Sequence, residues 1–141
     1  MHSLFAFFGL NSVEVHGDLS QEERLGNVEK FQRGEVDYLL ATDLVARGLD
    51  ISAVTAVLNF SFPTEPKRYL HRVGRTARAG SHGQAVTLCN DEERKEIKKL
   101  IRKLNQKLLP YTVPHKLIKM AHDYITNTLD PVLREISLEF Q

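Results

Sequence analysis

Residues 67–80 read Lys-Arg-Tyr-Leu-His-Arg-Val-Gly-Arg-Thr-Ala-Arg-Ala-Gly, with five basic side chains, one histidine and no acidic residue. Three of the arginines, Arg68, Arg72 and Arg75, have the spacing i, i+4 and i+7. This spacing predicts a helix that stacks them on one face. Like charges so placed repel each other unless an anion neutralises them, and the flat guanidinium fork fits phosphate oxygens. The stretch therefore predicts an anion-binding helix, with a solvated basic face as the alternative.

Gly74 lies inside this stretch, between Arg72 and Arg75. A glycine in the middle of a helix costs roughly 1 kcal/mol relative to alanine. A close approach of the backbone is the usual reason to keep such a glycine. We therefore favour a functional site over a solvated face.

The sixth conserved motif of the DEAD-box RNA helicases, H-R-x-G-R-x-x-R, resembles residues 71–78. His71 favours this family, because DEAH-type relatives carry Gln at that place and DNA-directed relatives depart further. In the family, the arginines that match Arg75 and Arg78 reach the γ-phosphate of an ATP held mainly by the other core domain. Loss of such an arginine finger costs on the order of 10³–10⁵ in rate. The resemblance implies that Arg75, Arg78 and His71 are catalytic and that Arg75 and Arg78 also bind the nucleotide.

A second segment, residues 39–51, is an apolar run followed by Thr42, Asp43 and later Gly48 and Asp50. By itself it could be a Walker B magnesium site, but that needs a Gly-x-x-x-x-Gly-Lys-Ser/Thr loop, and none of the eight glycines precedes a lysine. A buried strand with a structural Asp cap is the other alternative. The run also resembles the fifth motif of the family. That resemblance implies RNA-backbone contact at Thr42 and Asp43, and contact of Gly48 and Asp50 with the ATP ribose, where a carboxylate can accept hydroxyl hydrogen bonds.

A third segment, residues 16–24, resembles the fourth-motif region of the family, where Gln and Arg contact RNA phosphates. A helix N-terminus suits such contacts because its free N–H groups and dipole favour an anion. Plain surface residues are the alternative. Contacts to the nucleic-acid backbone carry no sequence information, so we expect little sequence preference. The RNA-binding residues implied here are Gly17, Asp18, Gln21 and Arg24.

Helical and strand patterns alternate along the chain, which predicts a parallel α/β sheet with ligands at the carboxyl ends of the strands. Two apolar runs, 37–42 and 54–60, predict strands buried on both faces. The turns after the strands, at residues 17–18, 42–43 and 59, are expected on one edge. Ser20 with Glu23 predicts a capping box, and Asn90 with Glu93 predicts the start of a helix over 91–109. The remaining expected elements are helices at 3–9, 67–78, 115–129 and 132–140 (the last after Asp130 and Pro131) and strands at 13–15 and 84–89.

The resemblance covers about residues 3–109 and implies a RecA-like, P-loop NTPase-like three-layer fold, a parallel sheet with helices on both faces. We expect residues 1–109 to form this domain, truncated at its N-terminus, and residues 110–141 to form a C-terminal helical extension. The first strand, which should precede the helix at 3–9, is missing. A missing central strand would leave a sheet edge exposed. We infer a fragment or an incomplete gene model.

The 141 residues, 42% hydrophobic and 26% charged, have the composition of a soluble globular domain. No apolar run approaches the roughly 20 residues that span a bilayer. Cys89 is the single cysteine, which fits a reducing, intracellular compartment. The six histidines lack the spacing of zinc ligands, so we expect no metal site. The net charge of +1 predicts no general nucleic-acid affinity, so any RNA binding needs local clusters.

The implied function is the C-terminal core domain of an ATP-dependent RNA helicase that unwinds or remodels RNA. The chain lacks the Walker A lysine and an Asp-Glu-Ala-Asp sequence. We therefore expect ATP with Mg²⁺ to be held mainly by an N-terminal RecA-like domain of the same protein, and no hydrolysis by this chain alone. The alternatives are a non-catalytic helicase-like interaction module and half of a DNA helicase. The tail after residue 113 loosely resembles the nucleolar, ribosome-assembly branch, which implies pre-ribosomal particles as partners and a nuclear or nucleolar location.

Overall fold

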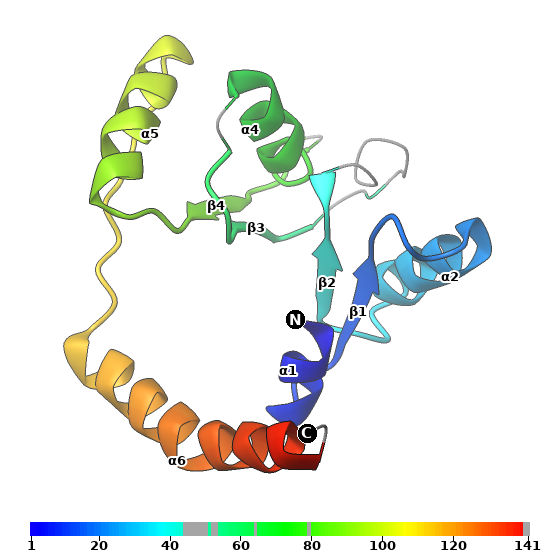
Figure 1. Cartoon of the computed structure of the whole chain (residues 1–141). Coiled ribbons are helices and arrows are strands. Elements are labelled where there is room, and N and C mark those ends of the chain that lie inside the picture. The colour runs from blue at the N-terminus through cyan, green and yellow to red at the C-terminus, as the bar shows by residue number, and fades with distance from the viewer. Residues whose placement is uncertain (44–50, 52–53, 64, 79, 140–141) are drawn as a thin grey trace. The chain divides into compact units, whose positions relative to one another are not determined.

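The computed structural model describes residues 1–43, 51, 54–63, 65–78 and 80–139, the last eleven by their backbone alone (Figure 1). The chain divides into two compact units, Met1–Lys103 and Leu104–Gln141. The first unit contains parallel strands and helices, so the predicted α/β class is confirmed. Its elements are α1 (His2–Phe7), β1 (Ser12–Val15), α2 (Gln21–Gln32), β2 (Tyr38–Ala41), β3 (Ala56–Asn59), α4 (Pro66–Val73), β4 (Gln84–Thr87) and α5 (Asp91–Lys103).

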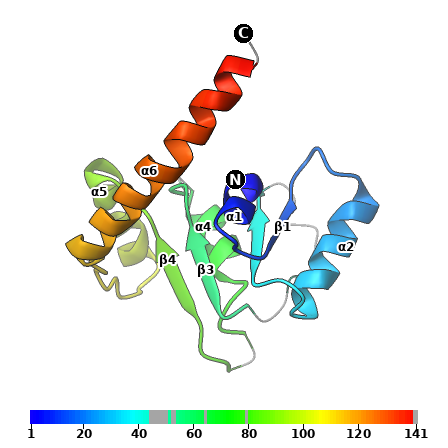
Figure 2. The same cartoon turned by 90° about the horizontal axis from the view of Figure 1, so that it is seen from below.

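The four strands form two separate parallel pairs. β1 pairs with β2, from Ser12 opposite Tyr38 to Val15 opposite Ala41. β3 pairs with β4 in the same way, and the two lie side by side in Figure 2. Within the described residues, β2 and β3 are not hydrogen-bonded to each other. In the part of the chain that the structure describes, each of these two strands therefore has one strand neighbour.

The prediction that residues 37–42 and 54–60 are buried on both faces is wrong. Tyr38 is 43% exposed, Leu58 60% and Phe60 66%. A strand is buried on both faces only where other elements cover both faces of its sheet. Among the described residues, these side chains are not covered in that way.

The apolar core of the first pair lies between the strands and α2. Val15, Val28 and Ile51 are buried together, and half-buried apolar side chains pack around them. The predicted capping box begins α2: Glu23 N–H donates to Ser20 Oγ and Ser20 N–H donates to Glu23 Oε2. Hydrogen bonds from the side chain and the backbone of Ser20 to the carboxylate lower the pKa of Glu23 below its ordinary value.

α5 begins as predicted, with reciprocal hydrogen bonds between Asn90 and Glu93. Its apolar side, Ile97, Leu100 and Ile101, is buried. The helix ends at Lys103 instead of residue 109, because Asn105 adopts a left-handed φ of 50°, a common way to end a helix.

The second unit contains α6 (His115–Glu139), which is continuous. The predicted break between residues 129 and 132 is therefore wrong. Pro131 removes one backbone hydrogen bond, and a helix of 25 residues retains many others. None of the helices in the described part of the chain has the length and apolar character needed to cross a membrane.

Candidate functional site

The Arg-rich helix is shorter than predicted. α4 ends at Val73, and Gly74 is its C-cap, so Arg75 lies beyond the helix and does not stack on Arg68 and Arg72. Gly74 N–H donates to Leu70 O at 2.8 Å. A Cβ at Gly74 would lie 2.7 Å from Leu70 O, closer than real Cβ atoms come. The expected close backbone approach at Gly74 is thus confirmed, and it occurs at the end of the helix.

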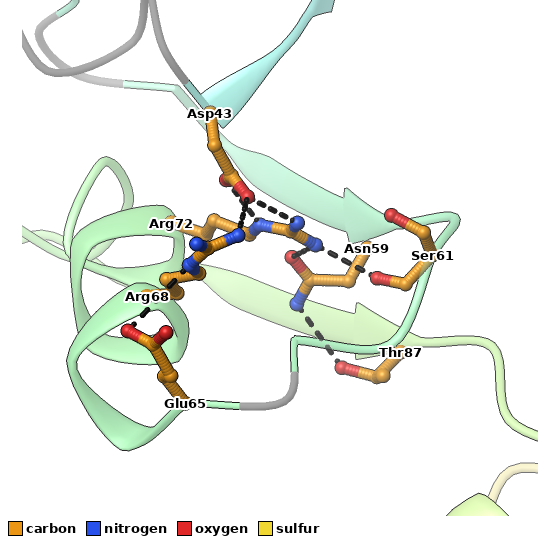
Figure 3. Close-up of polar contacts among 7 residues, drawn as sticks. All are labelled: Asp43, Asn59, Ser61, Glu65, Arg68, Arg72 and Thr87. Atoms are coloured by element: carbon orange, nitrogen blue, oxygen red, sulfur yellow. Dashed lines mark hydrogen bonds and ion pairs between the residues drawn. The ribbon is translucent and has the colours of Figure 1, made fainter.

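Arg72 makes a two-point ion pair with Asp43, the second residue after β2 (Figure 3). Its Nε donates to Asp43 Oδ1 at 2.6 Å and its Nη2 to Oδ2 at 2.8 Å. Its Nη1 donates to Ser61 O at 2.7 Å and to Asn59 Oδ1 at 3.4 Å. Asn59 is 2% exposed and donates to Thr87 Oγ1, which ties the network to β4. The hydrogen bonds to Asp43 raise the pKa of Arg72 above its ordinary value.

Arg68 is also neutralised within the chain. Its guanidinium lies 3.8 Å from Asp43 Oδ2 and 3.6 Å from Glu65 Oε2. The expectation that Arg68 and Arg72 need an external anion is therefore wrong, because two carboxylates supply the opposite charge. RNA contact by Asp43 stays a prediction, and its carboxylate binds Arg72 and Arg68 here.

The contacts of Arg72 also connect residues that follow different strands, as expected if the carboxyl ends of the strands lie on one edge. Arg72 bonds Asp43 after β2 and Asn59 at the end of β3. Thr42 N–H donates to Val15 O at the end of β1 at 3.2 Å. The carboxyl ends of the three strands are thus linked, as expected for a parallel α/β fold.

Thr76 anchors the segment after the helix, and sequence reasoning missed it. It is 7% exposed and forms a parallel bridge with Val54. Its hydroxyl donates to Val54 O at 2.5 Å. Gly83 packs against it so closely that a Cβ there would lie 2.1 Å from Thr76 Oγ1 and 2.6 Å from Ala77 N. Nothing local in the sequence indicates that Gly83 and Thr76 are partners.

The predicted arginine fingers lie on either side of this anchor. Arg75 is half-buried and Arg78 is exposed. Ala77, between Thr76 and Arg78, has a φ of 54°, unusual for a residue with a side chain. Arg78 Nε donates to Gly74 O at 2.6 Å, which holds this turn against the end of α4.

The donor chemistry of this turn suits phosphate oxygens, because guanidinium groups bind them as charged, planar forks.

Gly48 and Asp50, the predicted ribose contacts, lie outside the described residues. His71 is exposed on α4. Among the described residues, no three His, Cys, Asp or Glu side chains cluster as metal ligands would.

The turn after β1 brings together some of the predicted RNA contacts. Arg24 Nη2 donates to Gly17 O at 2.8 Å, so α2 holds the turn. Asp18 N–H donates to His16 Nδ1 at 3.3 Å. Gly17, Asp18 and Gln21 are exposed. Arg24 Nε is buried without a hydrogen-bond partner in the described part of the chain, which is costly unless a ligand or water reaches it.

Comparison with known proteins places residues 1–80 in a match to the helicase conserved C-terminal domain. The chain is 43% identical over 136 residues to DEAD-box ATP-dependent RNA helicase 28 of Arabidopsis thaliana, covering 96% of this chain and 17% of that protein. This chain therefore spans less than a fifth of that relative.

Solved structures agree. The C-terminal domain of the DEAD-box protein Dbp5 is similar with a TM-score of 0.71 and 28% identity, covering 90% of this chain and 74% of that domain. The Saccharomyces cerevisiae Dbp5 L327V protein, solved bound to RNA and ADP BeF3, has a TM-score of 0.69 and 29% identity, covering 89% of this chain and 34% of that one. Both neighbours support the predicted RecA-like fold.

Proposed function

This chain belongs to the DEAD-box RNA helicases, as their helicase conserved C-terminal domain, and we propose that it serves an ATP-dependent RNA helicase by supplying the arginine fingers, the ribose contact and part of the RNA groove. The whole protein would couple ATP hydrolysis to RNA unwinding or remodelling. The family match does not favour a non-catalytic interaction module.

The observation that carries this proposal is the fixed turn after α4. Arg75 is flanked by the Gly74 cap and the Thr76 anchor, and Arg78 is bonded back to Gly74 O. A preorganised cation acts best on charge that develops during reaction, because it need not reorganise. Both guanidiniums would bind phosphate oxygens, with Gly48 and Asp50 at the ribose. When bound, ATP with Mg²⁺, held mainly by the N-terminal RecA-like domain, supplies the phosphoryl group that is transferred to water.

The RNA groove would lie along the carboxyl ends of β1 and β2. Thr42 is bonded to the end of β1, and Arg24 holds the turn at Gly17. The carboxylate of Asp43 is paired with arginine, so it presents little net repulsion to a phosphate. The proposed RNA contacts are Gly17, Asp18, Gln21, Arg24, Thr42 and Asp43.

We test this with a chimera in which residues 1–141 replace the matching segment of the Arabidopsis thaliana helicase. Arg75→Ala should lower RNA-stimulated ATP hydrolysis by on the order of 10³-fold or more, as expected for an arginine finger. Arg94→Ala is the matched control, because Arg94 is an exposed arginine of α5, paired only loosely with Asp91 at 3.9 Å. Full activity of the Arg75→Ala chimera would refute the finger assignment.

For the cell, we propose pre-ribosomal particles as partners and the nucleolus as location, on the resemblance of residues 113–131 to the ribosome-assembly branch. Tagged full-length protein should sediment with pre-ribosomal particles in a sucrose gradient. Sedimentation only as a free protein would reject this part of the proposal.

A further inference from the structure

The Asp43–Arg72 ion pair joins two regions to which different tasks are proposed. Asp43 follows Thr42, the proposed RNA contact, and Arg72 precedes Arg75, the proposed finger. We propose that this ion pair is a positioning contact, through which RNA bound at Thr42 fixes the place of Arg75. The inference rests on the proposed function and adds a coupling between its two sites.

The path from one site to the other is short and consists of direct contacts. Asp43 is covalently next to Thr42, whose N–H is bonded to Val15 O. Arg72 holds both carboxylate oxygens of Asp43, at 2.6 and 2.8 Å. Arg75 N–H in turn donates to Arg72 O at 3.2 Å. A shift of residue 43 is therefore passed to residue 75 through one ion pair and one backbone hydrogen bond.

The geometry suits a rigid link. The fork of Arg72 meets the carboxylate with two parallel bonds, which fixes orientation as well as distance. The side chains of Arg72 and Asp43 are 19% and 25% exposed, so water competes only partly for the pair. Asn59 and Ser61 hold the third nitrogen of Arg72, which leaves the guanidinium little freedom to follow Asp43 by rotation alone.

Arg72 is proposed as a positioning residue because its guanidinium donates to oxygens of Asp43, Asn59 and Ser61. Arg68 provides a contrast on the same helix. Its guanidinium lies 3.8 Å from Asp43 Oδ2 and also pairs with Glu65, and its side chain is 44% exposed. A long, exposed, one-point pair of this kind contributes little and transmits little.

The test measures ATP hydrolysis by the chimera with and without poly(U) RNA. Arg72→Lys keeps the charge but loses the fork, and Arg72→Gln removes the charge. Both should lower the stimulation by RNA by about tenfold or more, through kcat at saturating RNA, while the rate without RNA and the KM for ATP change by less than about threefold. Arg68→Lys is the control and should keep the wild-type stimulation.

A double-mutant cycle separates positioning from general structural damage. In the Arg75→Ala background, Arg72→Lys should cause no further loss of kcat, because there is no finger left to position. An equal loss in both backgrounds, or wild-type stimulation in both Arg72→Lys and Arg72→Gln, would overturn the inference. Failure of the proposed function is recognised separately, since Arg75→Ala alone would then retain full activity.

Discussion

The two strand pairs of the first unit are held together in different ways. The β1–β2 pair is held by burial of apolar side chains, with Val15 completely inaccessible at the centre. On the β3–β4 pair, Leu58 is 60% exposed, and the most buried strand residue is polar, Asn59 at 2%. Asn59 belongs to the hydrogen-bond network of Arg72.

The first pair contributes mainly to the stability of the fold, and the second pair contributes mainly to the exact placement of side chains. Apolar burial is non-directional and contributes in proportion to area. Hydrogen bonds and forked ion pairs contribute less net stability but constrain angle and distance. The proposed fingers lie beside the polar pair, where Arg75 N–H donates to Arg72 O and the Thr76 hydroxyl donates to Val54 O. We therefore expect mutations in the first pair to reduce mainly stability, and mutations around the second pair to change mainly the site.

The largest expected stability effect is in the apolar pair. Val15→Ala removes buried methyl groups from a fully buried position and should lower the free energy of unfolding by roughly 2–3 kcal/mol. Urea denaturation of the 141-residue chain, at low and high salt, measures this loss in the free energy of unfolding. The loss should not depend on salt, because no charge is involved.

Val113→Ala is the matched control, because Val113 is 44% exposed and should lose less than about 0.5 kcal/mol. Equal losses at the two valines would mean that the first pair has no real core.

A smaller effect is expected beside the polar pair. Gly83→Ala places a Cβ against Thr76 and should lower the free energy of unfolding by about 1–3 kcal/mol, because Thr76 must leave its bond to Val54 O. Gly26→Ala is the control: nothing lies within 4 Å of its added Cβ, and α2 should gain up to about 1 kcal/mol. Thermal unfolding of both variants measures the contrast. A neutral Gly83→Ala would show that the Thr76 anchor is loose.

The smallest effect concerns the capping box of α2. The folded-state pKa of Glu23 is below its ordinary value of 4.5, because Ser20 donates to the carboxylate. Glu23 therefore stabilises the fold above pH 4.5, and this contribution is lost as the pH falls through the lowered folded pKa. Relative to Glu23→Gln, which cannot titrate, the wild-type chain should lose stability over this acidic range. Denaturation as a function of pH measures it.

Glu22→Gln serves as the control for this titration, since Glu22 occupies the same first turn without a partner in the capping box. If the wild type and Glu23→Gln lost stability in parallel on acidification, the capping carboxylate would have no role in acid stability.

Local patterns predicted local structure well. The capping residues Ser20 and Asn90 and the close approach at Gly74 depend on neighbours a few residues away, so the sequence contains the information for them. The family resemblance supplied the wider fold and the assignment of Arg75 and Arg78. Burial of the central strands could not be predicted in this way, because it depends on which strands flank them.

Contacts between distant segments were the main failure. Arg72 and Asp43 are 29 positions apart, and no sequence pattern indicates that they form an ion pair. The negative charge expected beside Arg68 and Arg72 comes from the carboxylates of Asp43 and Glu65. The close packing of Gly83 against Thr76 could not be predicted from the sequence for the same reason. These non-local contacts fix the geometry of the site.

The central claim is that Arg75 reaches the phosphate of a nucleotide held by another domain. Single-turnover ATP hydrolysis by the chimera at saturating ATP and poly(U) RNA tests it most directly, because it isolates the chemical step from nucleotide binding. The account predicts that Arg75→Ala slows this step by on the order of 10³-fold or more. An unchanged single-turnover rate would contradict it.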